Sequence, residues 1–331
     1  MAVKRALITG IYGQDGSYLA ELLFGEEYEV HGIARYPLSA NAIVISEHLK
    51  KKSISSLFLH KCDLNSYAEV RELMIKVQPH ECYHLATSHY SSEIFGSNRN
   101  LLDRELFHSN VSASLNLIGA ISEVSRNTRF IMAGSCLMFE KSDQSPQSEY
   151  TPFASDSMYG LSKITASNIL NYFRETHGLH LSVAILYNHE SPRRQNTFIS
   201  KKIVSNLVKV KRNIISGFSL GDLSAIRDWG YAKDYVYGMW LMAQREKPKD
   251  YILATGEGHS VEEFLDCAAK QLSINFKDII EQKKEIIGKP IKTLLLGDPS
   301  LARSELKWSG TVGFEELVAI LIKNELNGAL D

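Results

Sequence analysis

Short, β-rich apolar runs alternate with longer amphipathic segments through the first half of the chain, and this alternation constrains the fold more than any other feature. The runs RALIT, YEVHGIA, SSLFLHK and ECYHLA are separated by segments such as SYLAELLF and YAEVRELMIKV. Strands joined by helical crossovers run parallel, and the crossing helices cover the sheet. The sequence therefore predicts an α/β fold with a doubly wound parallel sheet.

The same alternation continues to Leu186 and then becomes irregular. It predicts two further helices, at about 101–124 and 159–176, and two strands, at 128–133 and 181–186. Beyond Leu186, prolines fall among shorter elements, which indicates a smaller, mixed α/β unit. These are Pro192, Pro248, Pro290 and Pro299.

A regular helix at about 232–244 and a strand at 251–254 are expected to return to the main sheet. The predicted domain boundary is therefore discontinuous. We expect a dinucleotide-binding domain of residues 1–187 plus about 228–256, and a substrate-binding domain of about 188–227 plus 257–331.

Composition excludes several classes of partner and compartment. The 37 basic and 38 acidic side chains leave a net charge of −1, so no overall basic field exists for a nucleic acid or an anionic membrane. The four cysteines form no CxxC pair, which argues against a zinc site and a disulfide framework. No signal peptide or membrane-spanning run is recognisable. We expect a soluble, cytoplasmic protein without a metal.

A glycine-rich turn follows the first predicted strand and precedes an amphipathic helix. It reads T-G-I-Y-G-Q-D-G-S and contains Gly10, Gly13 and Gly16. Glycine at these positions lets the backbone approach a pyrophosphate, which then sits at the helix N-terminus. A simple flexible loop is the alternative, but the strand and helix on either side favour a Rossmann-like dinucleotide site.

The end of the second strand predicts the choice of cofactor. In sites for NAD, an acidic residue there bonds the ribose 2′-hydroxyl, whereas this chain carries Arg35 and no acid. A cation suits the 2′-phosphate of NADP, which we expect in preference to NAD; a solvated surface arginine is the alternative. Asp63, after the third strand, is a candidate partner of the adenine amino group or, alternatively, a helix cap.

Tyr159 and Lys163 lie four residues apart, on one face of a predicted helix. A pair at this spacing arises by chance in a chain with 15 tyrosines. The order of features gives it weight, because the glycine-rich turn and a strand that ends near Ser135 precede it. This order resembles the extended short-chain dehydrogenase/reductase superfamily. The resemblance implies that Tyr159 accepts a proton from a substrate hydroxyl, assisted by the Lys163 charge and by the Ser135 hydroxyl.

Longer strings narrow the resemblance to one family. The strings, among them G-I-Y-G-Q-D-G-S-Y-L-A-E-L-L, N-H-E-S-P-R-R, R-D-W-G-Y-A-K-D-Y-V and A-T-G-E-G-H-S-V, run from the first strand to near Trp308. They resemble the GDP-mannose 4,6-dehydratase family. The resemblance implies a resident NADP and a nucleotide-sugar substrate, with GDP as the expected nucleotide. It also implies oxidation at sugar C4, elimination of water across C5 and C6, and return of the hydride to C6.

The resemblance also implies roles for individual residues. The catalytic residues would be Ser135, Tyr159 and Lys163. The cofactor-binding residues would be Gly10, Gly13, Gln14, Asp15, Gly16, Arg35, Asp63, Leu64, Tyr159, Lys163 and His189. The substrate-binding residues would be Asn188, Arg193, Lys202, Arg227 and Lys289, of which the arginines suit a diphosphate. An ordinary surface pair is the alternative for Arg193 and Arg194.

Three departures from the family pattern bear on function. The family's S-T-S-E-L-Y-G becomes G-S-C-L-M-F-E, so Leu137 stands where the family has the glutamate that removes the C5 proton. The stretch Tyr83–Tyr90 is one residue shorter than its counterpart. The family's R-P-x-E becomes K-P-I-K, with Lys289 and Lys292.

These departures leave three hypotheses open. The first is an NADP-dependent enzyme that transfers a hydride at C4 and stops at oxidation, reduction or epimerisation, because a leucine accepts no proton. The second is a true 4,6-dehydratase with a substitute base, for which His89, Cys136 and Glu140 are candidates. The third is a catalytically silent paralogue that binds the nucleotide sugar or NADP.

We also expect a homo-oligomer, a dimer or tetramer. The segment from Arg35 to Lys52 is long and partly apolar for a loop, and in the resembled family its equivalent reaches a neighbouring subunit. A loop that covers its own domain is the alternative.

Overall fold

A seven-stranded parallel sheet forms the centre of the molecule. We describe it from a computed structural model that covers residues 3–34, 36–52, 54–87, 99–283 and 293–328. The strand order is β10-β6-β5-β4-β1-β2-β3. These strands are β1 (Arg5–Thr9), β2 (Glu29–Ile33), β3 (Leu57–His60), β4 (Glu81–His84), β5 (Arg129–Ala133), β6 (Leu181–Leu186) and β10 (Tyr251–Leu253). The predicted doubly wound α/β fold is confirmed.

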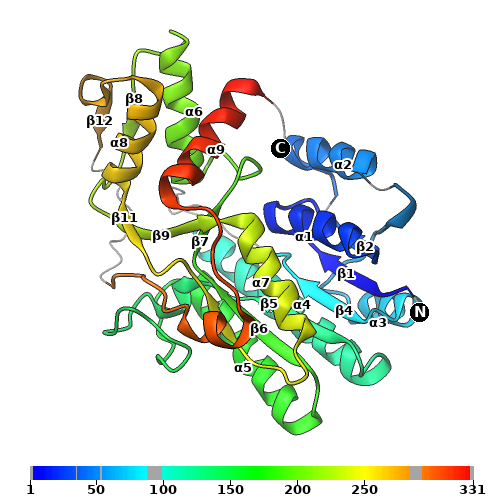
Figure 1. Ribbon diagram of the computed structural model, residues 1–331. Helices are drawn as coiled ribbons and strands as arrows, with labels where there is room; N and C mark the ends of the chain where they lie inside the picture. The colour runs from blue at the N-terminus through cyan, green and yellow to red at the C-terminus, as the bar shows by residue number, and fades with distance from the viewer. Residues whose placement is uncertain (1–2, 35, 53, 88–98, 284–292, 329–331) are drawn as a thin grey trace.

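Helices cover both faces of this sheet, and each face has its own apolar core (Figure 1). The helices packed on one face are α1 (Gln14–Gly25), α2 (Ala40–Lys52) and α7 (Ala232–Gln244). Those on the other face are α3 (Tyr67–Val77), α4 (Arg99–Val124) and α5 (Met158–His177). The strands between the two cores, β1, β4, β5 and β6, are almost wholly buried, as two-sided coverage requires.

The later part of the chain forms a third apolar core. Its helices are α6 (Ile199–Lys211), α8 (Val261–Leu272) and α9 (Phe314–Asn327), and they lie together at one end of the molecule (Figure 1). Two small sheets accompany them, in the orders β11-β9-β7 and β12-β8. Their strands are β7 (Asn188–Glu190), β8 (Phe218–Leu220), β9 (Ile226–Tyr231), β11 (Gly258–Ser260) and β12 (Ile280–Gln282).

Strand β10 pairs with β6 in parallel and α7 packs on the main sheet, so the predicted return of this segment is confirmed. The division of the chain into two domains remains a prediction. In the part of the chain that the structure describes, no helix is both long and apolar enough to cross a membrane.

Part of the segment between Arg35 and Lys52 is helical, so its interpretation as a loop is wrong. Residues 40–52 form α2, in which Ile45 and Leu49 lie one turn apart and are buried on the core. Ile43 and Val44, which directly precede Ile45, are exposed, with 45% and 50% of their surface accessible. Because exposed apolar residues lie directly beside the buried ones in the sequence, the spacing of a helix is obscured.

Candidate active site

A cleft of about 690 Å³ opens at the carboxyl ends of the first four strands. Its walls come from the residues that follow β1, β2, β3 and β4, together with part of α4, and include Gly10, Ala34, Asp63, Thr87 and Asn110. Ligands of open parallel sheets bind at this edge, and the volume lies in the range of small-molecule sites.

The glycine-rich turn forms the floor of the cleft. Gly10 has a φ of +75°, and a Cβ there would lie 3.0 Å from the Ala86 backbone. A Cβ on Gly16 would lie 2.3 Å from the Gly10 carbonyl oxygen, so the helix start could not approach the strand. Gly13 is the N-cap of α1, whose first N–H groups have no acceptor within the helix. These residues fit the pyrophosphate of a dinucleotide cofactor.

Two of the residues predicted to contact the cofactor, Asp63 and Leu64, line the cleft. The Asp63 carboxylate accepts a hydrogen bond from the Asn65 N–H at 3.0 Å, and the cap of α3 is Ser66. The alternative interpretation of Asp63 as a helix cap is therefore wrong. Arg35, the residue on which the NADP prediction depends, lies outside the described residues.

The three predicted catalytic residues come from two neighbouring elements. Ser135 follows β5, while Tyr159 and Lys163 lie in the first turns of α5. The Ser135 hydroxyl accepts the Leu137 N–H at 3.2 Å, and Ser135 acts to lower the pKa of Tyr159. The Lys163 ammonium donates to the Ala133 carbonyl oxygen at 2.8 Å and lies 5.8 Å from the centre of the Tyr159 ring.

Burial changes the proton affinity of both titratable groups. It raises the pKa of Tyr159 to about 12, although hydrogen bonds to Thr87 and Ser135 and the charge of Arg194 act in the opposite direction. Burial lowers the pKa of Lys163 to about 8. A tyrosine held neutral beside a desolvated lysine needs further positive charge or hydrogen-bond donors before it can act as a base.

Leu137 is half-buried and packs on the core beneath α5. Of the substitute bases, Glu140 is buried and accepts hydrogen bonds from Ser155 Oγ at 2.6 Å and the Asp156 N–H at 2.8 Å. Burial raises the pKa of the Cys136 thiol to about 12. His89 lies outside the described residues. Glu140 is thus committed to the loop before α5, and Cys136 is a poor base near neutral pH.

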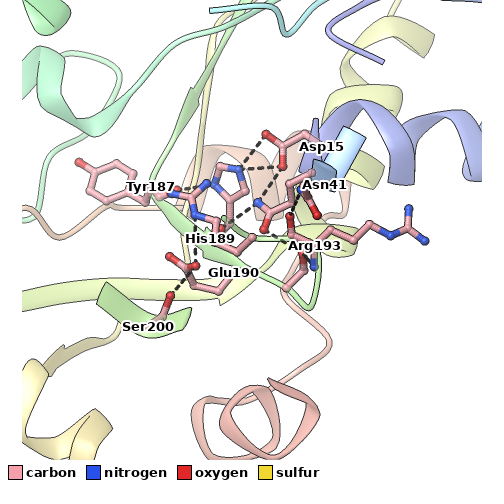
Figure 2. Close-up of polar contacts among 10 residues, drawn as sticks. Asp15, Asn41, Tyr187, His189, Glu190, Arg193 and Ser200 are labelled. Atoms are coloured by element: carbon pink, nitrogen blue, oxygen red, sulfur yellow. Dashed lines mark hydrogen bonds and ion pairs between the residues drawn. The ribbon is translucent and has the colours of Figure 1, made fainter. Parts of the chain in front are cut away.

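An ion pair joins the first turn of α1 to strand β7 (Figure 2). His189 Nε2 lies 3.0 Å from the Asp15 carboxylate, and the Gln14 amide donates to the His189 carbonyl oxygen at 3.1 Å. Burial disfavours both charges, but the ion pair and its hydrogen bond together outweigh the effect of burial. The pKa of Asp15 is therefore lowered and that of His189 is raised. The pair keeps the Asp15 charge from repelling an anion at the helix N-terminus.

Arg193 requires a correction. Its side chain is completely buried: one guanidinium nitrogen donates to Ser17 at 3.0 Å, the other pairs with Glu21, and the group lies 3.8 Å from the centre of the Tyr18 ring. A guanidinium enclosed against α1 is not open to a diphosphate, so Arg193 holds the segment after β7 on that helix. The alternative of a surface pair is wrong as well.

Three of the remaining predicted substrate residues lie on β7, α6 and β9. Asn188 begins β7, and its side-chain oxygen lies 4.0 Å from the Cys136 sulfur. Arg227, on β9, is near the same cysteine, and burial lowers the pKa of its guanidinium. Lys202 is half-buried on α6. Lys289 and Lys292 lie outside the described residues.

Two residues near the Tyr159 hydroxyl were missed by the sequence reasoning. Arg194 places a positive charge near Tyr159, Asp15 and His189, although it was considered only as a surface residue. Thr87 acts to lower the pKa of Tyr159, and its hydroxyl donates to the Asn110 side-chain oxygen at 3.1 Å. The available signal for Thr87 was its position directly after a buried strand, where ligand-contacting residues of parallel sheets lie.

Fold and site together define the chain as an extended short-chain dehydrogenase/reductase. The class shows in the glycine-rich turn after β1, the seven-stranded sheet, and the tyrosine and lysine four residues apart beside a hydroxyl at the end of β5. Within this class the chain belongs to the GDP-mannose 4,6-dehydratase family, whose model, GDP-mannose 4,6 dehydratase, matches residues 7–321.

Curated relatives agree with this assignment. The chain is 40% identical to GDP-mannose 4,6 dehydratase 2 of Arabidopsis thaliana, over 98% of this chain and 87% of that protein. It is 37% identical to GDP-mannose 4,6 dehydratase of Homo sapiens, over 96% of this chain and 90% of that one.

Solved structures share the fold at low identity. A UDP-glucuronic acid 4-epimerase mutant from Bacillus cereus, in complex with a fluorinated UDP-sugar and NAD, superposes with a TM-score of 0.84 at 17% identity over 98% of this chain and 100% of that chain. A dTDP-glucose 4,6-dehydratase from Bacillus anthracis, in complex with NAD, gives 0.82 at 15% identity over 97% and 96%.

Proposed function

We propose that this protein is an NADP-dependent enzyme that transfers a hydride at C4 of a nucleotide-bound sugar, with a GDP-hexose as the expected substrate. The observation that carries the proposal is the placing of the buried Lys163 ammonium 5.8 Å from the centre of the Tyr159 ring, together with a cleft at the strand ends that fits a dinucleotide. The names of the curated relatives support GDP-mannose as the starting point.

The chain's own residues divide the work at C4. Tyr159 takes the proton from the sugar hydroxyl, and Ser135, whose oxygen already accepts the Leu137 N–H, has its own proton available for the same oxygen. Lys163 and Arg194 stabilise the tyrosinate through their charge. The bound NADP supplies the hydride acceptor.

The residues expected to hold the cofactor follow the strand ends. Gly10, Gly13 and Gly16 admit its pyrophosphate to the helix start, while Asp63 and Leu64 face its adenosine. Arg35 is proposed for the 2′-phosphate, because the sequence has no acid at the end of β2. For the substrate we retain Asn188, Lys202, Arg227 and Lys289.

We further propose that the reaction stops after hydride transfer. Removing the C5 proton requires a base within hydrogen-bond reach, and general-base catalysis contributes typically 10²–10⁴-fold in rate. Leu137 has no acceptor atom, the Glu140 carboxylate accepts three protein hydrogen bonds, and Cys136 is held protonated. The product expected from the wild-type protein is a 4-keto sugar or its reduced or epimerised form.

Mass spectrometry of GDP-mannose after incubation with the protein and NADP tests this proposal. A loss of two mass units is expected for the wild type, and Leu137→Glu should add a product that has lost 18. The control is Leu137→Gln, which introduces a side chain of the same size as glutamate but without a carboxylate. This variant should form no dehydrated product. Rapid formation of the dehydrated product by the wild type would contradict the proposed stop at C4.

The second candidate, a complete 4,6-dehydratase, is favoured by the shared name of relatives that match almost the whole chain. It predicts the loss of 18 mass units in the wild type. A silent paralogue predicts an unchanged sugar in every variant. The mass change separates oxidation, dehydration and no reaction, and chromatographic comparison with unreacted GDP-mannose separates an epimer, which keeps the mass of the substrate, from the unchanged sugar of a silent paralogue.

A further inference from the structure

Gln14 lies between the proposed cofactor site and the segment that contains Asn188. It is the first residue of α1 and directly follows Gly13, which lines the cleft. Its own N–H is one of the first N–H groups of the helix, which have no acceptor within the helix. The residue is only 9% exposed. The main chain of Gln14 is therefore placed to meet a pyrophosphate, while its side chain is enclosed by protein.

The Gln14 side chain uses both of its N–H groups and its oxygen within the protein. The amide nitrogen donates to the Asp15 carboxylate and to the His189 carbonyl oxygen, each at 3.1 Å. The amide oxygen accepts the Ser191 hydroxyl at 2.8 Å. Because a carboxylate and a carbonyl only accept, the nitrogen must face them and the oxygen must face Ser191. The side chain therefore joins the first turn of α1 to two residues of β7 and the segment after it.

His189 is held on both sides of its ring (Figure 2). Its Nε2 lies 3.0 Å from the Asp15 carboxylate, and its Nδ1 donates to the Tyr187 carbonyl oxygen at 2.7 Å. Asn188, proposed above for the substrate, lies directly between Tyr187 and His189 at the start of β7. The position of Asn188 therefore depends on bonds that begin at the first turn of α1.

We propose that Gln14 is a positioning residue that couples the two sites, so that the cofactor and the nucleotide of the sugar substrate each bind more tightly when the other is bound. An anion at the helix start holds the first turn of α1 through its N–H groups. Gln14 then holds His189 and Ser191, so the ligand that binds second meets a segment that is already ordered. The inference rests on the proposed function, because it takes the cleft as the cofactor site and Asn188 as a substrate residue.

The size of the coupling follows from the bonds that form the link. Coupling between two sites is typically about 5–150-fold in affinity, and a link of three hydrogen bonds favours the lower end, about five- to tenfold. We define the coupling factor as the Kd of GDP without NADP divided by its Kd with saturating NADP. Because linkage is reciprocal, GDP must lower the Kd of NADP by the same factor.

Two variants weaken the link to different extents. Gln14→Met keeps the length of the side chain and removes all three bonds, so the coupling factor should fall close to one. Ser191→Ala removes one bond and should lower the factor in part. The double variant should behave like Gln14→Met alone, because both changes act on the same link.

Isothermal titration calorimetry on the full-length protein, freed of bound nucleotide with charcoal, measures both Kd values. GDP and NADP are the ligands, and no turnover occurs because GDP has no sugar. Gln244→Met is the matched control. The Gln244 amide also donates twice, to Glu81 and to the Trp240 carbonyl oxygen at 3.1 Å each, and accepts once, from Lys4 at 3.3 Å. Because Glu81 and Lys4 lie at the amino ends of β4 and β1, opposite the cleft, this variant should keep the wild-type coupling factor.

The expected result is a reciprocal factor of about five to ten in the wild type and in Gln244→Met, with its loss in Gln14→Met. A wild-type factor in Gln14→Met, or an equal loss in Gln244→Met, would overturn the role of Gln14. Ser191→Ala decides the matter in the same way if Gln14→Met is too unstable to titrate. Failure of the proposed function has a different signature, since the wild type would then not bind NADP or GDP at all. Two ligands that bind the wild type independently would overturn the coupling alone.

Discussion

Replacing Arg193 by methionine tests whether this residue is structural. Methionine keeps the length and apolar contact of the side chain but removes its charge and its donors. The Arg193 side chain is 0% and that of Glu21 17% exposed, so the change leaves a carboxylate that is poorly solvated and unpaired. Breaking a buried ion pair from one side costs about 3–5 kcal/mol, and the lost contact with the Tyr18 ring adds about 0.5–2 kcal/mol. Because Glu21 keeps some solvent access and its contact with His48, we expect a loss near the lower limit of the two contributions together, about 3.5 kcal/mol.

Urea denaturation of the unliganded protein, followed by circular dichroism, measures this loss. Glu21→Gln should destabilise the protein similarly, and the double variant should lose less than the sum of the two, because the charges are removed together. Arg71→Met, which breaks the exposed pair with Glu123, is the control and should change stability little. Unchanged stability of Arg193→Met, together with weaker binding of GDP-mannose, would refute the structural role and return Arg193 to the substrate.

Four further predictions follow from the site. Lys163→Met should lower the rate of hydride transfer by about 10²–10⁴-fold, measured by NADPH absorbance, because the tyrosinate loses its neighbouring charge. The Asp15–His189 pair should stabilise the fold fully below the ordinary histidine pKa of 6.5 and lose this contribution as the pH rises through the raised pKa of His189. It should also lose it as the pH falls below the ordinary aspartate value of 3.8. Urea midpoints of the wild type and His189→Gln should therefore converge in alkali, and a constant difference would contradict the pairing. Cofactor released by denaturation should be NADP(H), and NAD(H) alone would contradict the role of Arg35. Light scattering should give a mass two or four times the 37.2 kDa of one chain, whereas a monomer at micromolar concentration would contradict the expected oligomer.

Much of the fold could be predicted because apolar periodicity records which side of each element is buried. The strand at 181–186 and the helix at 232–244 agree with the structure at both ends, since both elements consist largely of apolar residues. Helix α2 was missed because Ile45 and Leu49 are its only large apolar residues that are buried. The exposed Ile43 and Val44 beside them hide the helical spacing of these two residues.

Candidate site residues could be predicted where their types and their order along the chain are characteristic. Residues whose position depends on contacts between distant segments could not. Ser135, Tyr159 and Lys163 are recognisable because neighbouring elements present them together. The partner of Arg193 lies 172 positions away in sequence, so spacing gives no indication that this arginine is buried rather than open to a ligand. Thr87 illustrates the same limit, because its contact with Asn110 depends on how α4 packs beside β4.

The position of β10 at the outer edge of the sheet restricts how this gene can be cut and recombined. A fragment that ends at residue 187 would lack the strand that pairs with β6 and the helix α7 that covers one face. It would present an open, apolar strand edge, which promotes aggregation. Chimeras with relatives should therefore exchange residues 1–187 and 228–256 as one block, even though 40 residues of sequence separate the two pieces.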